Sequence, residues 1–108
     1  MPGRRAKRFR TGATIPVGFI GSGARFTADL IDLSTTGCLL RCPEKVHIGD
    51  IGRLGIKVGH ETLRVAATAI RDIPGVGVGF EFSQMYPRDR ELLRKLLMWM
   101  ENDTIPGT

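Results

Sequence analysis

The chain has 108 residues, of which 42% are hydrophobic and 25% are charged, and its formal net charge at pH 7 is +5. This length fits one compact domain, and the composition is that of an ordinary globular protein rather than a disordered or fibrous one. The longest apolar runs, such as LLMWM, are far shorter than the ~20 residues that a membrane-spanning helix requires. Because the N-terminus has no apolar signal segment, we expect a cytoplasmic protein without a membrane span.

The positive charge is concentrated near the N-terminus. Residues 1–28 hold six basic side chains and no acidic one, a charge of +6, whereas residues 29–108 hold ten basic and eleven acidic side chains, a charge of −1. A localised basic segment indicates an anionic partner (nucleic acid, a nucleotide or acidic lipid), although solvated basic tails are also common at termini. We expect residues 1–12 to form a flexible basic arm, residues 13–101 a folded domain, and residues 102–108 a tail.

Between Ala13 and Phe82, apolar and polar residues alternate between short turns, which predicts β-strands. In the segment ARFTADLIDL, Phe26, Ala28 and Leu30 share one face, and Asp32 continues the same parity. Six strands with short connections, antiparallel where adjacent, predict a small barrel or sandwich. The strand segments read ATIPVGFI, ARFTADLIDL, CLLRC, IGRLGIKV, ETLRVAATAIRD and VGVGFEF.

The last of these strands is rich in glycine. From Gly75 onward, glycines alternate with Val76, Val78 and Phe80, so that one face is bare backbone and the other is expected in the core. A dinucleotide-binding fingerprint would need a third glycine at position 80 and a helix after it. Because a phenylalanine and more strand follow instead, a dinucleotide-binding fold is excluded.

A helix is predicted after Pro87, a residue that suits the first helical position. The sequence RDRELLRKLLMWM places five apolar residues on one stripe and basic residues mostly opposite, so we expect the helix to cover one end or side of the barrel. Met98 and Trp99 lie beyond the stripe and are expected to be exposed. The stripe consists of Leu92, Leu93, Leu96, Leu97 and Met100.

The residues that commonly carry catalysis or bind metals form no recognisable constellation. His47 and His60 fall in predicted loops without a nucleophile nearby. Four strand steps place Cys38 and Cys42 about 13 Å apart, too far for a disulfide, and no zinc-ligand spacing is present. We therefore expect no enzyme, no metal site, and thiols that fill the core.

Two short motifs carry groups suited to a guanine nucleotide. Arg4 and Arg8, four residues apart, carry planar guanidinium groups that can grip a phosphate or the O6/N7 edge of guanine. In DLSTTG, Asp32 can accept hydrogen bonds from the N1–H and N2 amine of guanine, Ser34 offers a hydroxyl, and Gly37 lets a ligand approach the backbone. The same composition is also that of an ordinary turn.

RRAKR, followed after 23 residues by DLSTTG, resembles the R-x-x-x-R and [D/N]-x-S-x-x-G signatures of the PilZ-domain family of bacterial cyclic di-GMP receptors. The resemblance covers essentially the whole chain. It implies an all-β fold with one C-terminal helix, a six- to seven-stranded antiparallel barrel with an N-terminal arm. It also implies cyclic di-GMP as ligand with no further cofactor, a clamp formed by Arg4 and Arg8, and a second signature at Asp32, Ser34 and Gly37.

Two further arginines are candidates through the same resemblance: Arg5 for a phosphate, and Arg71 for stacking on a guanine. Charge-assisted hydrogen bonds from the dianionic ligand are expected to order the arm over the barrel. The surface formed by arm and ligand would then be recognised by a downstream protein partner.

Two other functions remain open. A small-barrel nucleic-acid-binding protein would use the basic arm on phosphates, but the few aromatic residues and the slightly acidic remainder of the chain argue against nucleic acid as the partner. A PilZ-like domain that binds only protein would use DLSTTG as a turn and leave the arginines solvated. The presence of both signatures favours the nucleotide receptor.

Overall fold

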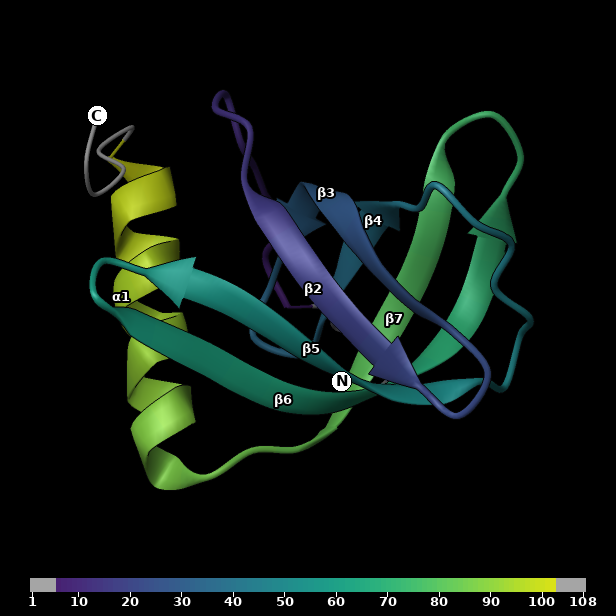
Figure 1. Ribbon diagram of the computed structural model, residues 1–108. Helices are drawn as coiled ribbons and strands as arrows, with labels where there is room; N and C mark the ends of the chain where they lie inside the picture. Colours follow the sequence, from purple (N-terminus) through teal and green to yellow (C-terminus); the bar gives the residue numbers. More distant parts are fainter. Residues whose placement is uncertain (1–5, 103–108) are drawn as a thin grey trace, which may run out of the picture.

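The computed structural model describes residues 6–102, which form seven strands and one helix (Figure 1). All strand pairs are antiparallel, and the order around the sheet is β1-β3-β2-β5-β6-β7-β4, with β4 returning to pair with β3. Strands β2 to β7 therefore close into a barrel, which confirms the predicted all-β fold with one C-terminal helix. The elements are β1 (Phe9–Arg10), β2 (Pro16–Gly21), β3 (Arg25–Leu33), β4 (Gly37–Arg41), β5 (Ile51–Val58), β6 (Glu61–Ile73), β7 (Gly77–Gln84) and α1 (Pro87–Glu101).

The centre of the barrel is filled by inward-facing side chains from every long strand, as the alternation predicted. The ring of Phe19 stacks on Phe26 with 4.9 Å between centroids and lies 5.7 Å from the ring of Phe80. A side chain at Gly52 would place its Cβ 2.5 Å from the Phe19 ring. The glycine therefore makes room for the aromatic cluster, which holds β2, β3 and β7 together.

The end of β3 departs from the predicted alternation. Leu30 pairs with Leu40, but Asp32 pairs with Leu39, so Ile31 is the extra residue of a β-bulge. Beyond the bulge, the odd-numbered residues of β3 point inward and the even-numbered ones outward. Leu33 therefore lies in the core and Asp32 lies at the surface. The prediction that Asp32 shares the face of Leu30 was therefore wrong, because spacing within one strand does not reveal a bulge.

The glycine-rich strand begins at Gly77, one residue later than the predicted segment VGVGFEF. Gly75 adopts a left-handed conformation with φ of 77°, so that it and Val76 belong to the β6–β7 turn. Val76, expected on the core face, is exposed, whereas Val78 and Phe80 are buried as predicted. Only Val76 thus passes from the predicted strand to the turn.

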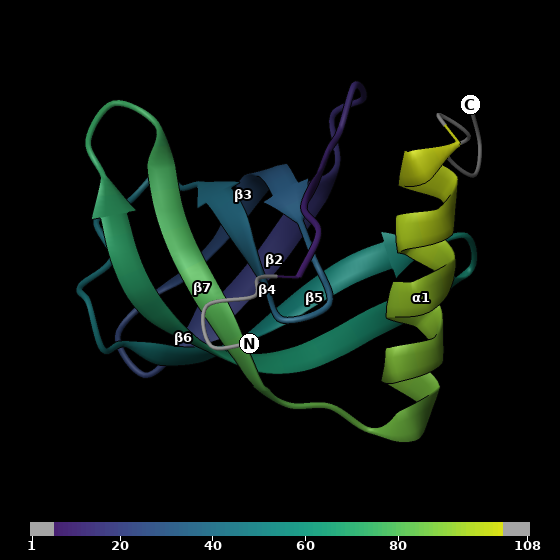
Figure 2. The same cartoon turned by 180° about the vertical axis from the view of Figure 1, so that it is seen from behind.

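Helix α1 lies across one end of the barrel, beside the β5–β6 hairpin (Figures 1 and 2). Its five predicted apolar residues are all buried, and Met98 is exposed as expected. Trp99 differs from the prediction, because it is half-buried and packs against the core. Within residues 6–102 no helix has the length and apolar character needed to cross a bilayer.

The helix also satisfies the free edge of β6. Strand β6 pairs with β7 only from Ala66 onward, so its preceding residues have no strand partner on that side. The backbone N–H of Arg64 instead donates to Oδ1 of Asp89 at 3.0 Å, and Arg88 donates to the Thr62 carbonyl at 3.4 Å. The buried carboxylate of Asp89 therefore anchors the first turn of α1 on the barrel.

Replacing Asp89 by alanine is expected to lower the free energy of unfolding by about 1–3 kcal/mol, because the partly buried Arg64 N–H loses its acceptor. The change is measured by urea denaturation. Glu91→Ala on the same helix is the control, since this side chain is exposed and pairs only with Arg94 among the described residues. Equal effects of the two substitutions would contradict the anchoring role of Asp89.

Candidate functional site

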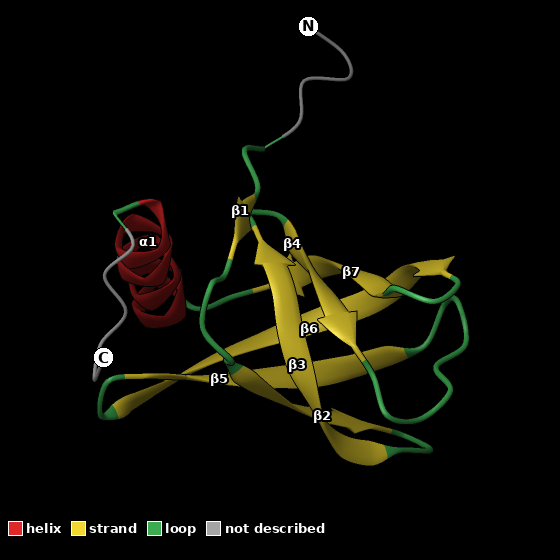
Figure 3. Ribbon diagram, turned by 90° about the horizontal axis from the view of Figure 1, so that it is seen from above, coloured by secondary structure: helices red, strands yellow, loops and turns green. Residues whose placement is uncertain are grey.

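The two sequence motifs meet at the end of β3. Nε of Arg8 donates a hydrogen bond to Oδ1 of Asp32 at 2.9 Å, in an ion pair whose side chains are 39% and 17% exposed. The backbone creates this contact, because β1 pairs Arg10 with Asp32 and so lays the arm along β3 (Figure 3). Arg4 and Arg5 lie outside the described residues. The pair remains accessible to an anion or a guanine from solvent.

The arm also contacts the helix. Nζ of Lys7 lies 3.8 Å from Oε2 of Glu101 and 5.0 Å from the centroid of the Phe9 ring. Phe9 in turn packs against the barrel core. Residues 6–12, predicted as part of a flexible arm, thus include the short strand β1 and contacts on both sides of Arg8.

The hydroxyl of Ser34 faces into the turn rather than the surface. The residue is 0% exposed, and its Oγ accepts hydrogen bonds from the backbone N–H groups of Thr36 and Gly37, at 3.2 Å each. The same hydroxyl donates to the Gly37 carbonyl at 3.2 Å. Ser34 therefore holds the β3–β4 connection in shape and positions the end of the strand that carries Asp32.

Gly37 is required by strand packing. A Cβ at this position would collide with the backbone carbonyl oxygen of Phe80, which belongs to the paired strand β7. The residue is buried in the structure. Its role is thus the close approach of two backbones, whereas the sequence indicated an approach by ligand.

The strand register aligns Asp32 with Arg71 across four strands. Asp32 pairs with Leu39, Leu39 pairs with Gly79, and Gly79 pairs with Arg71. Three strand spacings of about 4.8 Å separate the two charged residues. Strand β7 faces the viewer in Figure 2. The wall formed by β4 and β7 is therefore flanked by Asp32 on β3 and by Arg71 on β6.

Bare backbone lies beside Arg71 on this wall. A Cβ built at Gly79 would be 3.6 Å from Cβ of Arg71 and 3.8 Å from its Nε. Gly79 is buried, so its bare backbone lies beside the Arg71 side chain, which is itself exposed to solvent. The structure brings Arg8, Asp32 and Arg71 to one wall, which spacing along the chain could not predict.

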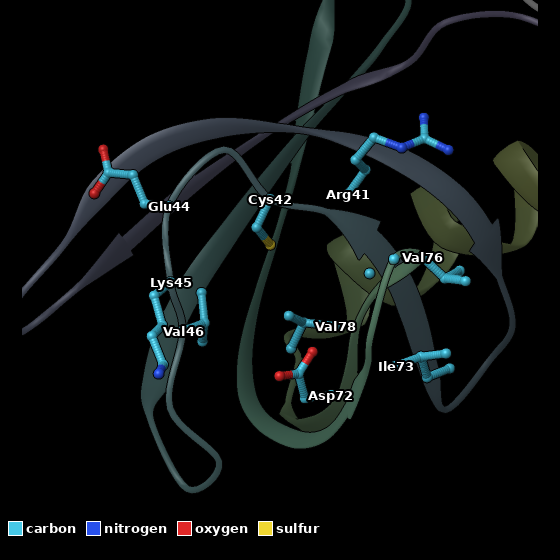
Figure 4. Close-up of a pocket in the computed structure, with 11 residues that line it drawn as sticks. Arg41, Cys42, Glu44, Lys45, Val46, Asp72, Ile73, Val76 and Val78 are labelled. Carbon is cyan, nitrogen blue, oxygen red and sulfur yellow. The ribbon is translucent and has the colours of Figure 1, made fainter.

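A pocket of about 290 Å³ lies apart from these residues (Figure 4). It is enclosed by the end of β4, the loop that follows it and the β6–β7 turn, and sequence motifs gave no sign of it. Its charges are mixed, with Arg41 and Lys45 among the cations and Glu44 and Asp72 among the acids. In Figure 4 the thiol of Cys42 points into the space between these segments.

Both cysteines are free, and their environments suppress thiolate formation. Burial raises the pKa of Cys38 far above its usual range; burial, followed by the charge of Asp72, raises the pKa of Cys42 to about 11. Over residues 6–102, no cluster of three or more His, Cys, Asp or Glu side chains is arranged to hold a metal ion. The Cys42 thiol at this pocket is therefore mostly protonated at neutral pH.

Alkylation by iodoacetamide is expected to modify Cys42 slowly at pH 8, with a rate that rises about tenfold per pH unit toward pH 11, because only the thiolate reacts. Cys38 is expected to react only after unfolding, since it is fully buried. Mass spectrometry of the native and urea-unfolded protein measures both rates. A native rate that is independent of pH, or equal for the two thiols, would contradict this assignment.

Comparisons with known proteins agree with this fold. The model of the PilZ domain family matches residues 3–99. No curated protein matches the chain in sequence. The structure is similar to the PilZ domain of CeSA from a cellulose-synthesizing bacterium, with a TM-score of 0.68 and 23% identity over 89% of this chain and 99% of that one.

Two further solved structures are similar. The PilZ domain of YcgR from Escherichia coli, with c-di-GMP, gives a TM-score of 0.74 and 18% identity over 94% of this chain and 93% of that one. MotI/DgrA, the inhibitor of motility of Bacillus subtilis, gives a TM-score of 0.69 and 18% identity over 92% of this chain and 52% of that one. Because the family model covers nearly all of the sequence and the barrel is the same, the chain belongs to the PilZ domain family.

Proposed function

We propose that this domain is a receptor for cyclic di-GMP, which it binds on the wall between Arg8, Asp32 and Arg71. The observation that carries the proposal is the ion pair of Arg8 with Asp32, which joins the two family signatures at an accessible surface. The YcgR domain of the same fold was solved with c-di-GMP, which supports the choice of ligand.

The chemistry of these groups fits the two halves of the ligand. The Arg8 guanidinium suits a phosphate or the O6/N7 edge of guanine, and the Asp32 carboxylate suits the N1–H and N2 amine. Without ligand the two side chains pair with each other, and exposed pairs of this kind contribute only about 0–1 kcal/mol. The ligand can therefore replace their mutual contact at little cost.

The remaining candidates extend the site at both ends. Arg71, which is exposed, stacks its planar guanidinium on a guanine of the ligand. The family resemblance assigns Arg4 to the clamp with Arg8 and Arg5 to a phosphate. In this proposal the ligand holds the arm across the wall, and a partner protein recognises arm and ligand together.

Calorimetric titration with cyclic di-GMP tests the proposal, with cyclic di-AMP and GTP as controls. We expect saturable binding of cyclic di-GMP at micromolar concentration. Cyclic di-AMP should fail to bind, since adenine lacks the paired N1–H and N2 donors that Asp32 accepts. Absence of binding at micromolar cyclic di-GMP, or equal binding of cyclic di-AMP, would exclude the proposed site.

A further inference from the structure

The wall opposite the candidate site carries cations that are not neutralised by acidic side chains. Arg53 and Lys57 project outward from β5 and Arg64 from β6, and all three are exposed. Strands β2, β5 and β6 face the viewer in Figure 1, whereas β7 does so in Figure 2, seen from behind. We call the outward face of β2, β5 and residues 61–68 of β6 the basic wall.

None of the ion pairs among residues 6–102 involves Arg53, Lys57 or Arg64. The outward positions of β2 and β5 hold no acidic residue at all. Glu61, at the start of β6, pairs with Arg88 instead. Although residues 29–108 have a charge of only −1, the fold thus separates the charges and leaves this wall positive.

The floor between these cations is bare backbone. Gly18 pairs with Gly55, and Gly55 pairs with Arg64 in the next strand. Arg53 and Lys57 flank Gly55 at two residues on either side, each about 7 Å along the strand. Three cations therefore surround one open position, where the surface is recessed to the level of the backbone.

Packing does not require these two glycines. A Cβ at Gly18 would meet only the Gly55 carbonyl oxygen at 3.9 Å, and a Cβ at Gly55 only Cγ2 of Thr62 at 3.6 Å, both ordinary contacts. This differs from Gly37 and Gly52, where a Cβ would collide with its neighbours. A glycine inside a strand costs roughly 0.5–1 kcal/mol relative to alanine. The open floor is thus kept where a side chain would fit and would stabilise the strand.

Exposed isoleucines adjoin the cations. Ile20, which is 52% exposed, pairs with Arg53, and Ile51, which is 65% exposed, lies two residues before Arg53 on the same face. Arginine is enriched in protein–protein interfaces, and the core of an interface is more apolar than the rest of the surface. The wall therefore offers both charge and apolar contact to a partner.

The same observations argue against other polyanions. The outward positions of β2, β5 and β6 hold no aromatic side chain on which the bases of a single strand could stack. The recessed glycine floor lies below the long side chains around it, so that a flat lipid surface cannot reach it. An acidic protein segment with side chains of its own meets both the cations and the floor.

We propose that the basic wall docks an acidic segment of a partner protein. Carboxylates of the segment pair with Arg53, Lys57 and Arg64, and one of its side chains lies over Gly18 and Gly55. This surface is separate from the nucleotide site, because it uses other residues on the opposite wall of the barrel. Docking here therefore does not depend on whether cyclic di-GMP binds.

The test is an NMR titration of the full chain with a synthetic twelve-residue peptide of Glu and Leu, and with the same peptide carrying Gln for Glu. We expect the acidic peptide alone to shift the amide signals of Gly18, Arg53, Gly55 and Arg64. Gly55→Glu fills the floor with a negative charge and should weaken peptide binding about tenfold or more, since like charges are brought together. Cyclic di-GMP binding of this variant should equal that of the original chain.

Gly12→Glu is the matched control, because it adds the same charge at a position with nothing within 4 Å that belongs to none of the strands of the basic wall. It should leave peptide binding unchanged. The proposal is wrong if shifts fall elsewhere, if the Gln peptide binds equally, or if both variants weaken binding alike. It is also wrong if single-stranded DNA, phosphatidylglycerol vesicles or a second copy of the chain occupies these residues more tightly than the peptide does. Loss of cyclic di-GMP binding alone concerns only the nucleotide site.

Discussion

Replacement of Arg8 by alanine is expected to weaken cyclic di-GMP binding about 10- to 100-fold, because hydrogen bonds to charged groups contribute about 1.5–3 kcal/mol. Arg8 is the described member of the arginine motif, and its side chain already lies at Asp32 on the proposed binding wall. Calorimetry of both proteins measures the change. Thermal unfolding should remain nearly the same, since the pair that is lost is exposed.

Arg10→Ala is the control for this experiment. Arg10 is exposed, lies two residues further along the arm and enters no ion pair within residues 6–102, so its replacement removes the same charge without removing the proposed contact. We expect nearly unchanged affinity for Arg10→Ala and a loss for Asp32→Ala similar to that for Arg8→Ala. If Arg8→Ala bound as tightly as the original chain, or if Arg10→Ala lost as much, the specific role of Arg8 would be refuted.

Replacement of Gly37 by alanine is expected to lower the free energy of unfolding by about 1–3 kcal/mol, because the new Cβ forces apart the backbones of β4 and β7. For a domain of this size, each kcal/mol lowers the Tm by about 4–8 °C. Thermal unfolding followed by circular dichroism measures the effect. Any loss of ligand affinity should accompany this loss of stability.

Gly55→Ala provides the comparison, since it is the same substitution in a strand where the added methyl group meets only ordinary contacts. We expect its Tm to equal or exceed that of the original chain. A Gly37→Ala variant that kept full stability but lost cyclic di-GMP binding would instead assign Gly37 to the ligand, as the sequence suggested.

The DLSTTG segment illustrates how far sequence reasoning reaches. The motif correctly predicted the connection between two strands, but its residues have different roles that residue type alone does not separate. Asp32 is at the surface, Ser34 is buried in hydrogen bonds of the turn, and Gly37 packs against a neighbouring strand. Aspartate, serine and glycine each serve turns and ligands equally well, and only burial decides between these uses.

The arginines of the two walls show the same limit. Arg71 was assigned through family resemblance, and its alignment with Asp32 arises from three strand pairings that no local pattern contains. The basic wall could not be predicted from the net charge of chain segments. Its charge depends on which residues of neighbouring strands point outward on the same side of the barrel. Arg53 and Arg64 become neighbours only when β5 pairs with β6.

The sequence by itself determined the strand segments, the apolar stripe of α1 and the presence of both motifs. These features depend on residues within a few positions of one another, so that periods of 2 and 3.6 reveal them. The tertiary structure alone decided the bulge at Ile31, the outward facing of Asp32 and the clustering of cations on the basic wall. The reason is physical: register is set by the packing of a closed barrel, whose contacts join residues far apart in the chain.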